Sequence, residues 1–142
     1  MRIEHSCPIA AEPEVVWALT EDVESWPSMT PTMKSVERLD DGPIRVGSTA
    51  RVVQPGQRPT VWTVGAIEPG RVFEWSARVM GMSMVARHVI EPAPRGCVNT
   101  LILEITGGAS SVLGRVLGRR LRAVLETENA GFKSRAESLN VV

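Results

Sequence analysis

The chain has 142 residues, of which 43% are hydrophobic and 23% charged, a composition typical of one packed domain and not of a disordered chain. Sixteen basic and sixteen acidic residues give a formal net charge of zero, which argues against nucleic acid as the main partner. No apolar run approaches the roughly 18–20 residues that span a bilayer, and residues 1–13 lack the apolar core of a signal peptide. We therefore expect residues 1–142 to form a single cytoplasmic domain without stable membrane insertion.

The first segment predicts one strand followed by two short helices. Residues 2–9 alternate between the two faces, with the odd-numbered residues on the more apolar face, as in a half-buried strand. Pro13, the acidic residues around it and the apolar residues after it are typical of the first turn of a short helix. Pro27 limits the segment 22–32 to one further helical turn around Trp26.

Six more strands are predicted between residues 33 and 106. Each ends at a turn that contains Gly, Pro or both, and this short regular spacing is typical of an antiparallel meander. The predicted strands are 33–39, 48–54, 60–67, 72–80, 83–90 and 98–106.

From Ser110 onward the hydrophobic period changes to that of a helix. Apolar residues recur at steps of three and four as far as Leu139, and charged residues fill most of the other side. This pattern predicts one amphipathic helix of about eight turns. Gly114, Gly118 and Gly131 weaken the helix, and they also allow a neighbouring segment to approach it closely.

These elements predict an α+β fold in which a long helix covers one face of an antiparallel sheet. A twisted sheet curves around the helix that it covers. A single helix is about 10–12 Å across and cannot fill the whole concave face. The remaining volume is therefore either plugged by large side chains or left as a pocket.

Four strings in the sequence resemble the START-like (SRPBCC) superfamily, specifically its bacterial polyketide cyclase/dehydrase and lipid-transport branch. They are AEPEVVW at 11–17, DVESWP at 22–27, IEPGRVFEW at 67–75 and HVIEP at 88–92. The resemblance implies a helix-grip fold, with a seven-stranded curved antiparallel sheet around the C-terminal helix and two short helices between strands 1 and 2. It also implies a cavity that usually takes a hydrophobic small molecule such as a lipid, a polyketide or an isoprenoid.

Strand parity places Trp62, Trp75, Met84 and His88 on the face that the helix covers. The two indole rings suit an apolar, partly aromatic ligand, although the same residues would also fill a core. Met84 adapts its shape to varied neighbours. A neutral His88 in an apolar cavity would orient a ligand carbonyl or move a proton, and its alternative is a hydrogen-bonded core histidine.

Further candidates come from the segments that close the implied cavity. Trp26 and Met29 lie in the break after the first helix, where they would either gate the cavity or anchor the loop. Leu117 and Leu121 lie on the apolar side of the long helix and are expected to line the cavity. Arg120 would reach the cavity mouth and bind a carboxylate or enolate, or else lie at the surface.

Motifs of common catalytic and metal sites are missing from the sequence. It contains no GxSxG, HExxH, P-loop or GxGxxG string. The cysteines Cys7 and Cys97 form no pattern with the two histidines that would hold a metal. We therefore expect neither a metal nor a cofactor. Carboxylates on the long helix, such as Glu128, are expected to be solvated or paired with arginine.

Three functions follow as hypotheses. The first is the binding of a hydrophobic small molecule in a cavity of at least about 300 Å³, the lower end for such sites. The second is a cyclase or dehydratase that uses the same cavity, with His88 and Arg120 as the candidate catalytic residues. The third is a protein-interaction module of the co-chaperone type that uses an exposed face. The sequence is compatible with a monomer or a homodimer.

Overall fold

The computed structural model describes residues 1–108 and 110–139, which form seven strands, two α-helices and one 3₁₀ helix. The expected domain 1–142 therefore ends three residues beyond the described part. The element bounds are β1 Arg2–Ile9, α1 Pro13–Glu21, the 3₁₀ helix η1 Val23–Ser28, β2 Ser35–Arg38, β3 Thr49–Val53, β4 Thr60–Glu68, β5 Val72–Val79, β6 Met82–Ala93, β7 Gly96–Thr106 and α2 Ser110–Leu139.

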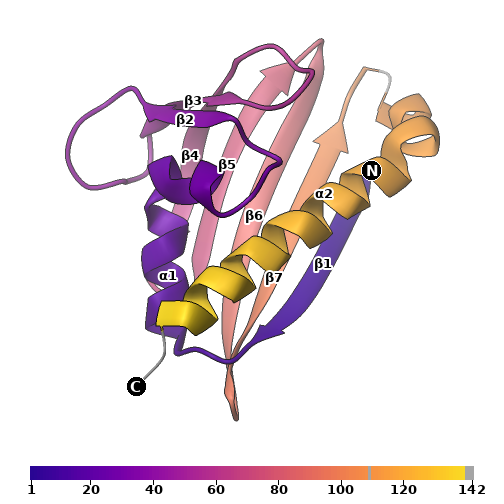
Figure 1. The fold of residues 1–142 in the computed structure, drawn as a ribbon. Coiled ribbons are helices and arrows are strands. Elements are labelled where there is room, and N and C mark those ends of the chain that lie inside the picture. Colours follow the sequence, from indigo (N-terminus) through magenta and orange to yellow (C-terminus); the bar gives the residue numbers. More distant parts are fainter. Residues whose placement is uncertain (109, 140–142) are drawn as a thin grey trace.

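All seven strands belong to one antiparallel sheet in the order β1-β7-β6-β5-β4-β3-β2. Strands β2 to β7 follow one another across the sheet, and β1 pairs with β7 at the far edge. The sheet curves around α2, which runs obliquely across its concave side (Figure 1). The predicted α+β helix-grip architecture is therefore confirmed, including the two short helices between the first two strands.

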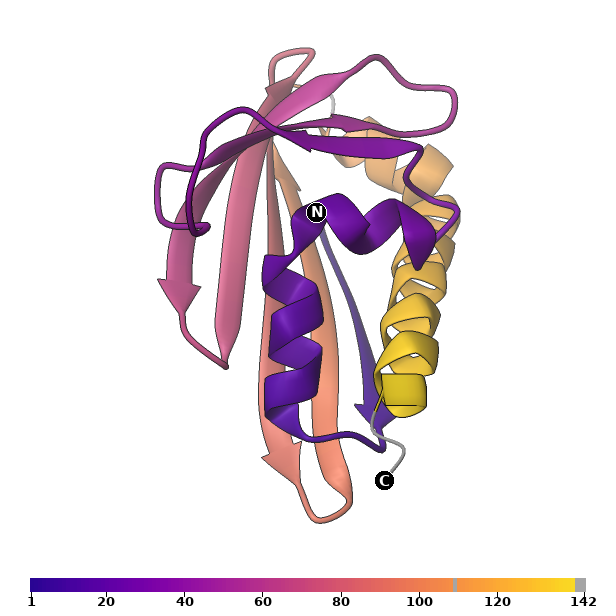
Figure 2. The same ribbon diagram turned by 60° about the vertical axis from the view of Figure 1, so that its left-hand side comes forward.

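The C-terminal half of α2 is held by the short helices on one side and by two strands on the other. A Cβ atom on Gly131 would lie only 2.2 Å from the Met29 carbonyl oxygen, so the chain after η1 approaches the helix at a position without a side chain. Figure 2 shows α1 and η1 on the same side of the sheet as α2. On the strand side, the buried Asn129 amide nitrogen lies 3.0 Å from the Asn99 carbonyl oxygen and 3.0 Å from His5 Nδ1.

Two strands, β6 and β2, differ most from the sequence prediction. Strand β6 runs on through Pro92 to Ala93 instead of ending at residue 90. Pro92 is tolerated because β5 begins at Val72, opposite Val89, so β7 alone pairs with the last residues of β6. At the other edge β2 is shorter than predicted and covers only Ser35–Arg38.

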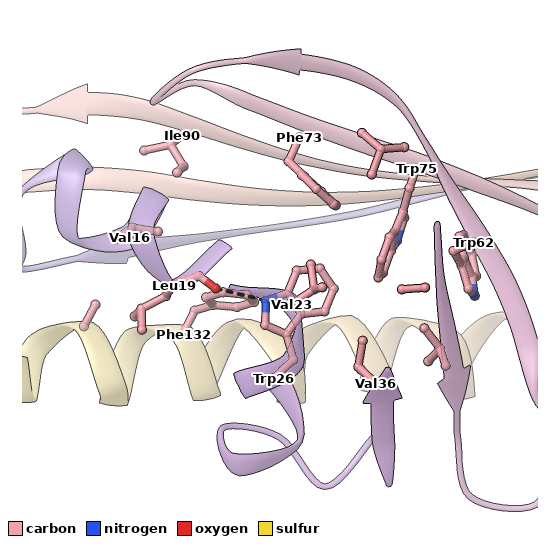
Figure 3. Close-up of a cluster of buried hydrophobic side chains, with 14 of the residues drawn as sticks. Val16, Leu19, Val23, Trp26, Val36, Trp62, Phe73, Trp75, Ile90 and Phe132 are labelled. Carbon is pink, nitrogen blue, oxygen red and sulfur yellow. Dashed lines mark hydrogen bonds between the residues drawn. The ribbon is translucent and has the colours of Figure 1, made fainter. Parts of the chain in front are cut away.

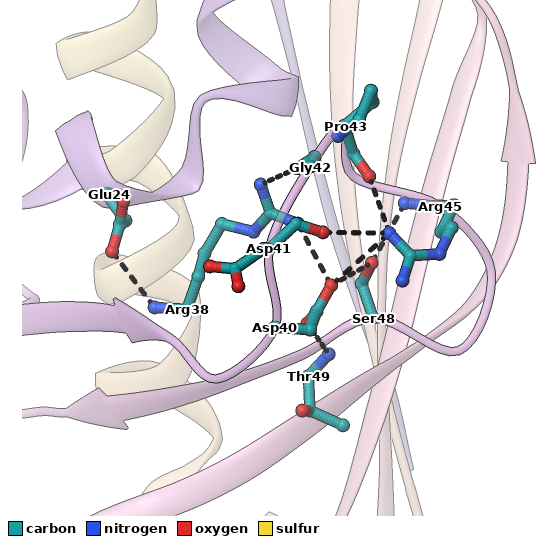
Figure 4. Close-up of polar contacts among 9 residues, drawn as sticks. All are labelled: Glu24, Arg38, Asp40, Asp41, Gly42, Pro43, Arg45, Ser48 and Thr49. Atoms are coloured by element: carbon teal, nitrogen blue, oxygen red, sulfur yellow. Dashed lines mark hydrogen bonds and ion pairs between the residues drawn. The ribbon is translucent and has the colours of Figure 1, made fainter.

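The connection between β2 and β3 is organised by one carboxylate, Asp40 (Figure 4). It accepts hydrogen bonds from the Thr49 backbone N–H at 2.9 Å, the Ser48 hydroxyl at 3.0 Å and the Arg38 guanidinium at 3.1 Å. These bonds, that of Thr49 first, lower the pKa of Asp40 below its ordinary value. The loop is thereby fixed beside β4, the strand that carries Trp62, where the Gly47 N–H donates to the Val64 carbonyl at 2.8 Å.

Candidate functional site

A cavity of about 100 Å³ lies between the concave face of the sheet and α2. Its walls come from β3 to β7, from η1 and the segment after it, and from the middle of α2. Six of the side chains that the sequence predicts for a ligand site line this cavity: Trp26, Trp62, Trp75, Met84, His88 and Leu121. The cavity is also lined by the exposed Gln57 of the β3–β4 connection, so it reaches the surface there.

Trp26 is the centre of an aromatic cluster that forms one wall of the cavity (Figure 3). Its ring centroid lies 5.1 Å from that of Trp75, 4.9 Å from that of His88 and 5.9 Å from that of Phe132. Its indole N–H donates to the Leu19 carbonyl at 3.0 Å, so the ring is fixed to the end of α1. Trp26 therefore anchors the loop and at the same time lines the cavity.

The rings of Trp62 and Trp75 contact each other, with 5.6 Å between their centroids, and both line the cavity. Neither indole N–H has a hydrogen-bond partner among the described residues. Two large apolar surfaces with free donors are thus available to a bound molecule.

Three predicted residues lie outside this cavity. Met29 is half-buried and packs against the main core beside α2. Leu117 is half-buried one turn before Leu121, nearer to the start of α2. Arg120 is exposed to solvent on the outer side of the helix, so the structure gives no support to a role for its guanidinium in the cavity.

The prediction for Glu128 is wrong, because this side chain is buried and lines the cavity. The Thr32 hydroxyl donates to Glu128 Oε1 at 3.0 Å, and Thr32 in turn lies 2.9 Å from the Thr30 hydroxyl. Burial raises the pKa of Glu128 to about 7, with the Thr32 bond acting in the opposite direction. At neutral pH a large share of these carboxyl groups is therefore protonated and able to donate a hydrogen bond.

A signal for Glu128 was present in the sequence. The inward stripe of α2 runs through Leu121, Leu125 and Phe132, and position 128 falls between the last two at steps of three and four. The charge of the side chain argued for solvent, but its position argued for the cavity. Its position on the helix determines that Glu128 is buried, because protonation of the carboxyl group removes most of the free-energy penalty for burying it.

His88 is the second polar group of the cavity and is 5% exposed. Its ring lies tilted by 31° over that of Trp26, and its Nδ1 has no hydrogen-bond partner among the described residues. Burial lowers the pKa of His88 to about 4, so the imidazole is neutral at neutral pH. A neutral imidazole carries one N–H donor and one acceptor nitrogen, and the tautomer decides which ring nitrogen plays which role.

The cavity is smaller than the binding hypothesis expected, at about 100 Å³ against at least about 300 Å³. The large rings of Trp26, Trp75 and Phe132 occupy much of the space between sheet and helix. The open volume has the size of a single ring or a short chain, comparable with an engineered cavity of about 150 Å³ that binds benzene.

Neither a metal cluster nor a membrane-spanning helix is found among residues 1–108 and 110–139. No three His, Cys, Asp or Glu side chains there lie close enough together to hold a metal ion. None of the helices in that part has the length and apolar character that a bilayer crossing requires.

Comparisons with known proteins agree with this architecture. Residues 1–137 match the model of the family described as polyketide cyclase / dehydrase and lipid transport. A comparison of the sequence with curated proteins finds no match.

Solved structures with the same fold show low sequence identity to this chain. The protein TTHA0849 from Thermus thermophilus has a TM-score of 0.80 at 15% identity, covering 99% of this chain and all of that one. A START superfamily protein from Mycobacterium smegmatis has a TM-score of 0.75 at 17% identity, covering 97% of this chain and 98% of that one.

The di-domain ARO/CYC protein StfQ from the steffimycin biosynthetic pathway also matches, with a TM-score of 0.79 at 15% identity over 97% of this chain. This chain spans about half of that protein, 51% of its length. The solved structures share the fold of this chain, and the family model over nearly the whole sequence shows that the chain belongs to the polyketide cyclase / dehydrase and lipid-transport family.

Proposed function

We propose that the cavity binds the end of a hydrophobic small molecule that carries a neutral hydrogen-bond acceptor, such as a ketone or ester carbonyl. The observation that carries the proposal is the position of Glu128, a buried carboxyl group in a cavity lined by Trp26, Trp62 and Trp75. Membership of the family supports a fold that binds hydrophobic ligands.

The chemistry of the cavity favours a carbonyl over a carboxylate at the ligand end. Glu128 Oε1 accepts from Thr32, so in the protonated carboxyl group the second oxygen carries the proton and is free to donate it. A ligand carboxylate would face the negative charge of the ionised Glu128 and would lose its own hydration. A carbonyl oxygen needs only one donor, and Glu128 or the indole N–H of Trp62 or Trp75 supplies it.

The size of the cavity suggests how a larger molecule would be held. About 100 Å³ accepts a ring or a few carbon atoms, and the rest of the ligand would leave past Gln57 towards the surface. Met84 and Met33 line the cavity and can change rotamer at small cost to fit varied shapes.

The test is a calorimetric titration with two probes of the same shape, acetophenone and α-methylstyrene, which differ in having C=O or C=CH₂. We expect acetophenone to bind about 3- to 10-fold more tightly, the range for one net hydrogen bond of about 0.5–1.5 kcal/mol. This preference should fall as the pH rises through about 7, because ionised Glu128 cannot donate.

Variants at Glu128 separate its role from general damage to the cavity. Glu128→Leu should bind both probes equally, whereas Glu128→Gln should keep the ketone preference but lose its pH dependence, because an amide donates at every pH. Glu126→Gln, at an exposed position two residues earlier on α2, is the matched control and should behave like the natural protein. Failure of both probes and of longer alkyl phenones to bind would refute the proposal.

A cyclase or dehydratase is the second candidate function, and the same carboxyl group favours it. A group whose pKa lies near 7 can donate a proton to a leaving hydroxyl near neutral pH, and neutral His88 can accept one. Native mass spectrometry of the purified protein, followed by extraction of any bound molecule, distinguishes the two. A carrier returns an added β-hydroxyketone unchanged, whereas a dehydratase returns it lighter by one water molecule.

A further inference from the structure

The first turns of α2 carry an unbalanced positive charge. Residues 110–125 include four arginines and no acidic residue, although the whole chain has zero net charge. Arg115, Arg119, Arg120 and Arg122 are all exposed, and none forms an ion pair with a described residue. Other arginines of the fold are paired, as Arg2 is with Glu4 and Glu104.

Apolar side chains interrupt this charged surface where a helix would ordinarily be polar. Val112 is 61% exposed and Val116 is 73% exposed. At about 100° per residue, the two valines lie in the middle of the outward face, with Arg115 and Arg119 on one side and Arg120 on the other. The opposite side of the helix already packs on the sheet, so these valines have no role in the core.

A third exposed apolar residue lies at the tip of the hairpin between β5 and β6. Met80 is 91% exposed and has a φ of 51° in a two-residue turn with Gly81, whose φ is 78°. Turns with two positive φ angles strongly favour asparagine, aspartate or glycine, so a methionine here is strained and exposes its side chain without benefit to the fold.

The Met80 turn and the start of α2 lie at the same end of the molecule. A Cβ atom on Gly108 would lie 3.6 Å from the Gly81 carbonyl oxygen, and the Ser110 N–H donates to the Gly107 carbonyl at 3.1 Å. Figure 2 shows the hairpin tip and the first turns of α2 at the top of the molecule.

A groove beside the same helix face gives these arginines a concave site. It has a volume of about 390 Å³ and lies between the first residues of β1 and the first turns of α2. Arg115, Arg119 and Arg122 line it, and Gly118 leaves open space beside them, because a Cβ atom there would meet nothing within 4 Å. Its size and charge suit an anionic phosphate headgroup.

We propose that this end of the molecule docks on the surface of a bilayer that contains anionic phospholipids. The docking end is defined by Met80, Val112, Arg115, Val116, Arg119 and Arg122. Its arginines pair with lipid phosphates while the methionine and valines enter the interfacial layer, an arrangement typical of peripheral membrane binding. Free phosphate or a nucleic acid would account for the arginines but not for the apolar residues between them.

Vesicle co-sedimentation tests the proposal, using phosphatidylcholine vesicles with and without phosphatidylserine. We expect the protein to sediment with the anionic vesicles only and to be released by high salt, which screens the charges. Each arginine near a charged membrane strengthens binding about fivefold, so Arg115→Gln/Arg119→Gln/Arg122→Gln should weaken it about 100-fold. The matched control Arg71→Gln/Arg95→Gln/Arg135→Gln removes three arginines from the β4–β5 turn, the β6–β7 turn and the C-terminal part of α2, and it should bind like the natural protein.

Met80→Asn separates docking from folding. Asparagine suits the turn better, so we expect the variant to be at least as stable as the natural protein and yet to bind anionic vesicles several-fold more weakly. Absence of binding to anionic vesicles, equal binding to neutral ones, or equal losses in the two triple variants would each overturn the proposal. Arginine-dependent binding of a DNA duplex without vesicle binding would also overturn it and would assign the surface to nucleic acid.

Discussion

Glu128 and His88 share one cavity, and burial shifts their pKa values in opposite directions. Folded Glu128 holds its proton up to about pH 7 instead of 4.5, so stability is lost as the pH rises between these values. Folded His88 resists protonation down to about pH 4 instead of 6.5, so stability is lost as the pH falls between these values. Between pH 4.5 and 6.5 the two slopes oppose each other, which flattens the stability profile of the natural protein.

Replacing either residue should leave the pH dependence of stability that is due to the other. Each full effect is about 3 kcal/mol, since a pKa difference of one corresponds to about 1.4 kcal/mol. Relative to the natural protein, Glu128→Gln should gain about 2–3 kcal/mol in free energy of unfolding at about pH 8 and little at about pH 4. His88→Gln should show the reverse, with its relative gain at the acidic end.

Urea unfolding across about pH 4 to 8 measures these differences. Glu126→Gln is the control, because that exposed side chain should give a profile parallel to that of the natural protein. If the profile of Glu128→Gln were also parallel to that of the natural protein, burial would not shift the pKa of the Glu128 carboxyl group.

At the residue scale, strand parity predicts which side chains face the cavity, whereas the charge of Glu128 led to the wrong environment for that residue. Trp62, Trp75 and Met84 followed from strand parity, because period-two alternation decides which face each residue occupies. Glu128 did not follow, because its charge indicated solvent although its position on the inward stripe indicated burial, and its hydrogen-bond partner Thr32 lies 96 positions away. Such a partner is visible only once the chain is folded.

Two glycines of α2 have opposite surroundings. A Cβ atom on Gly131 would collide with the Met29 carbonyl, whereas a Cβ atom on Gly118 would meet nothing within 4 Å. The sequence predicted that glycines allow a close approach, and the structure confirms this for Gly131. Gly114 meets the flexible end of the Met1 side chain and is an intermediate case.

The pair Gly131→Ala and Gly118→Ala should therefore change stability in opposite directions. Both gain helix propensity, worth about 0.5–1 kcal/mol for an exposed position. Gly118→Ala should keep this gain, whereas Gly131→Ala should lose about 1–3 kcal/mol overall because Met29 must move. Urea unfolding of both variants under the same conditions measures these changes in stability. Equal changes would show that Met29 moves away from residue 131 at little cost.

The elements themselves were predicted from local signals, and their ends were not. Turns rich in glycine and proline marked every strand of the meander. The extension of β6 through Pro92 depends on where β5 begins, because that decides whether the missing N–H of the proline faces a partner. Strand ends are thus a property of neighbouring strands and not of the strand alone.

Across the whole molecule the core is divided unevenly along α2. The larger cluster, around Trp26, Phe73 and Phe132, joins α1, η1 and the C-terminal half of the helix to the sheet. A smaller cluster around Leu101 and Leu125 lies towards the other end of the helix. All residues of α2 that are fully buried lie at or after position 125.

This division predicts a gradient of local stability along a single helix. Amide hydrogens of residues 125–136 should exchange much more slowly than those of residues 112–121, because opening the first half of α2 exposes little buried surface. Hydrogen-exchange mass spectrometry with peptides from both halves measures the gradient, and uniform protection along α2 would contradict it. Since Leu121 and Val124 line the cavity, opening of the first half would also enlarge the cavity.

The whole architecture could be predicted from the order of the elements, but the volume of the cavity could not. One strand, two short helices, six strands and one long helix leave few antiparallel arrangements. The open volume is a small difference between the space under the sheet and the side chains that fill it. The tilt of a few rings, Trp26 and Trp75 among them, decides that difference.

The pairing of β1 with β7 has a consequence for folding during synthesis on the ribosome. The backbone nitrogen of Met1 donates to the Ile105 carbonyl, 104 positions away, so the strand made first acquires its partner last. At about 5–20 residues per second, this interval lasts roughly 5–20 s. Throughout it the half-apolar β1 has no neighbour, while the hairpins from β2 to β6 can already form. We infer that the newly made chain is most prone to aggregation in this interval and becomes protected once Thr106 is released.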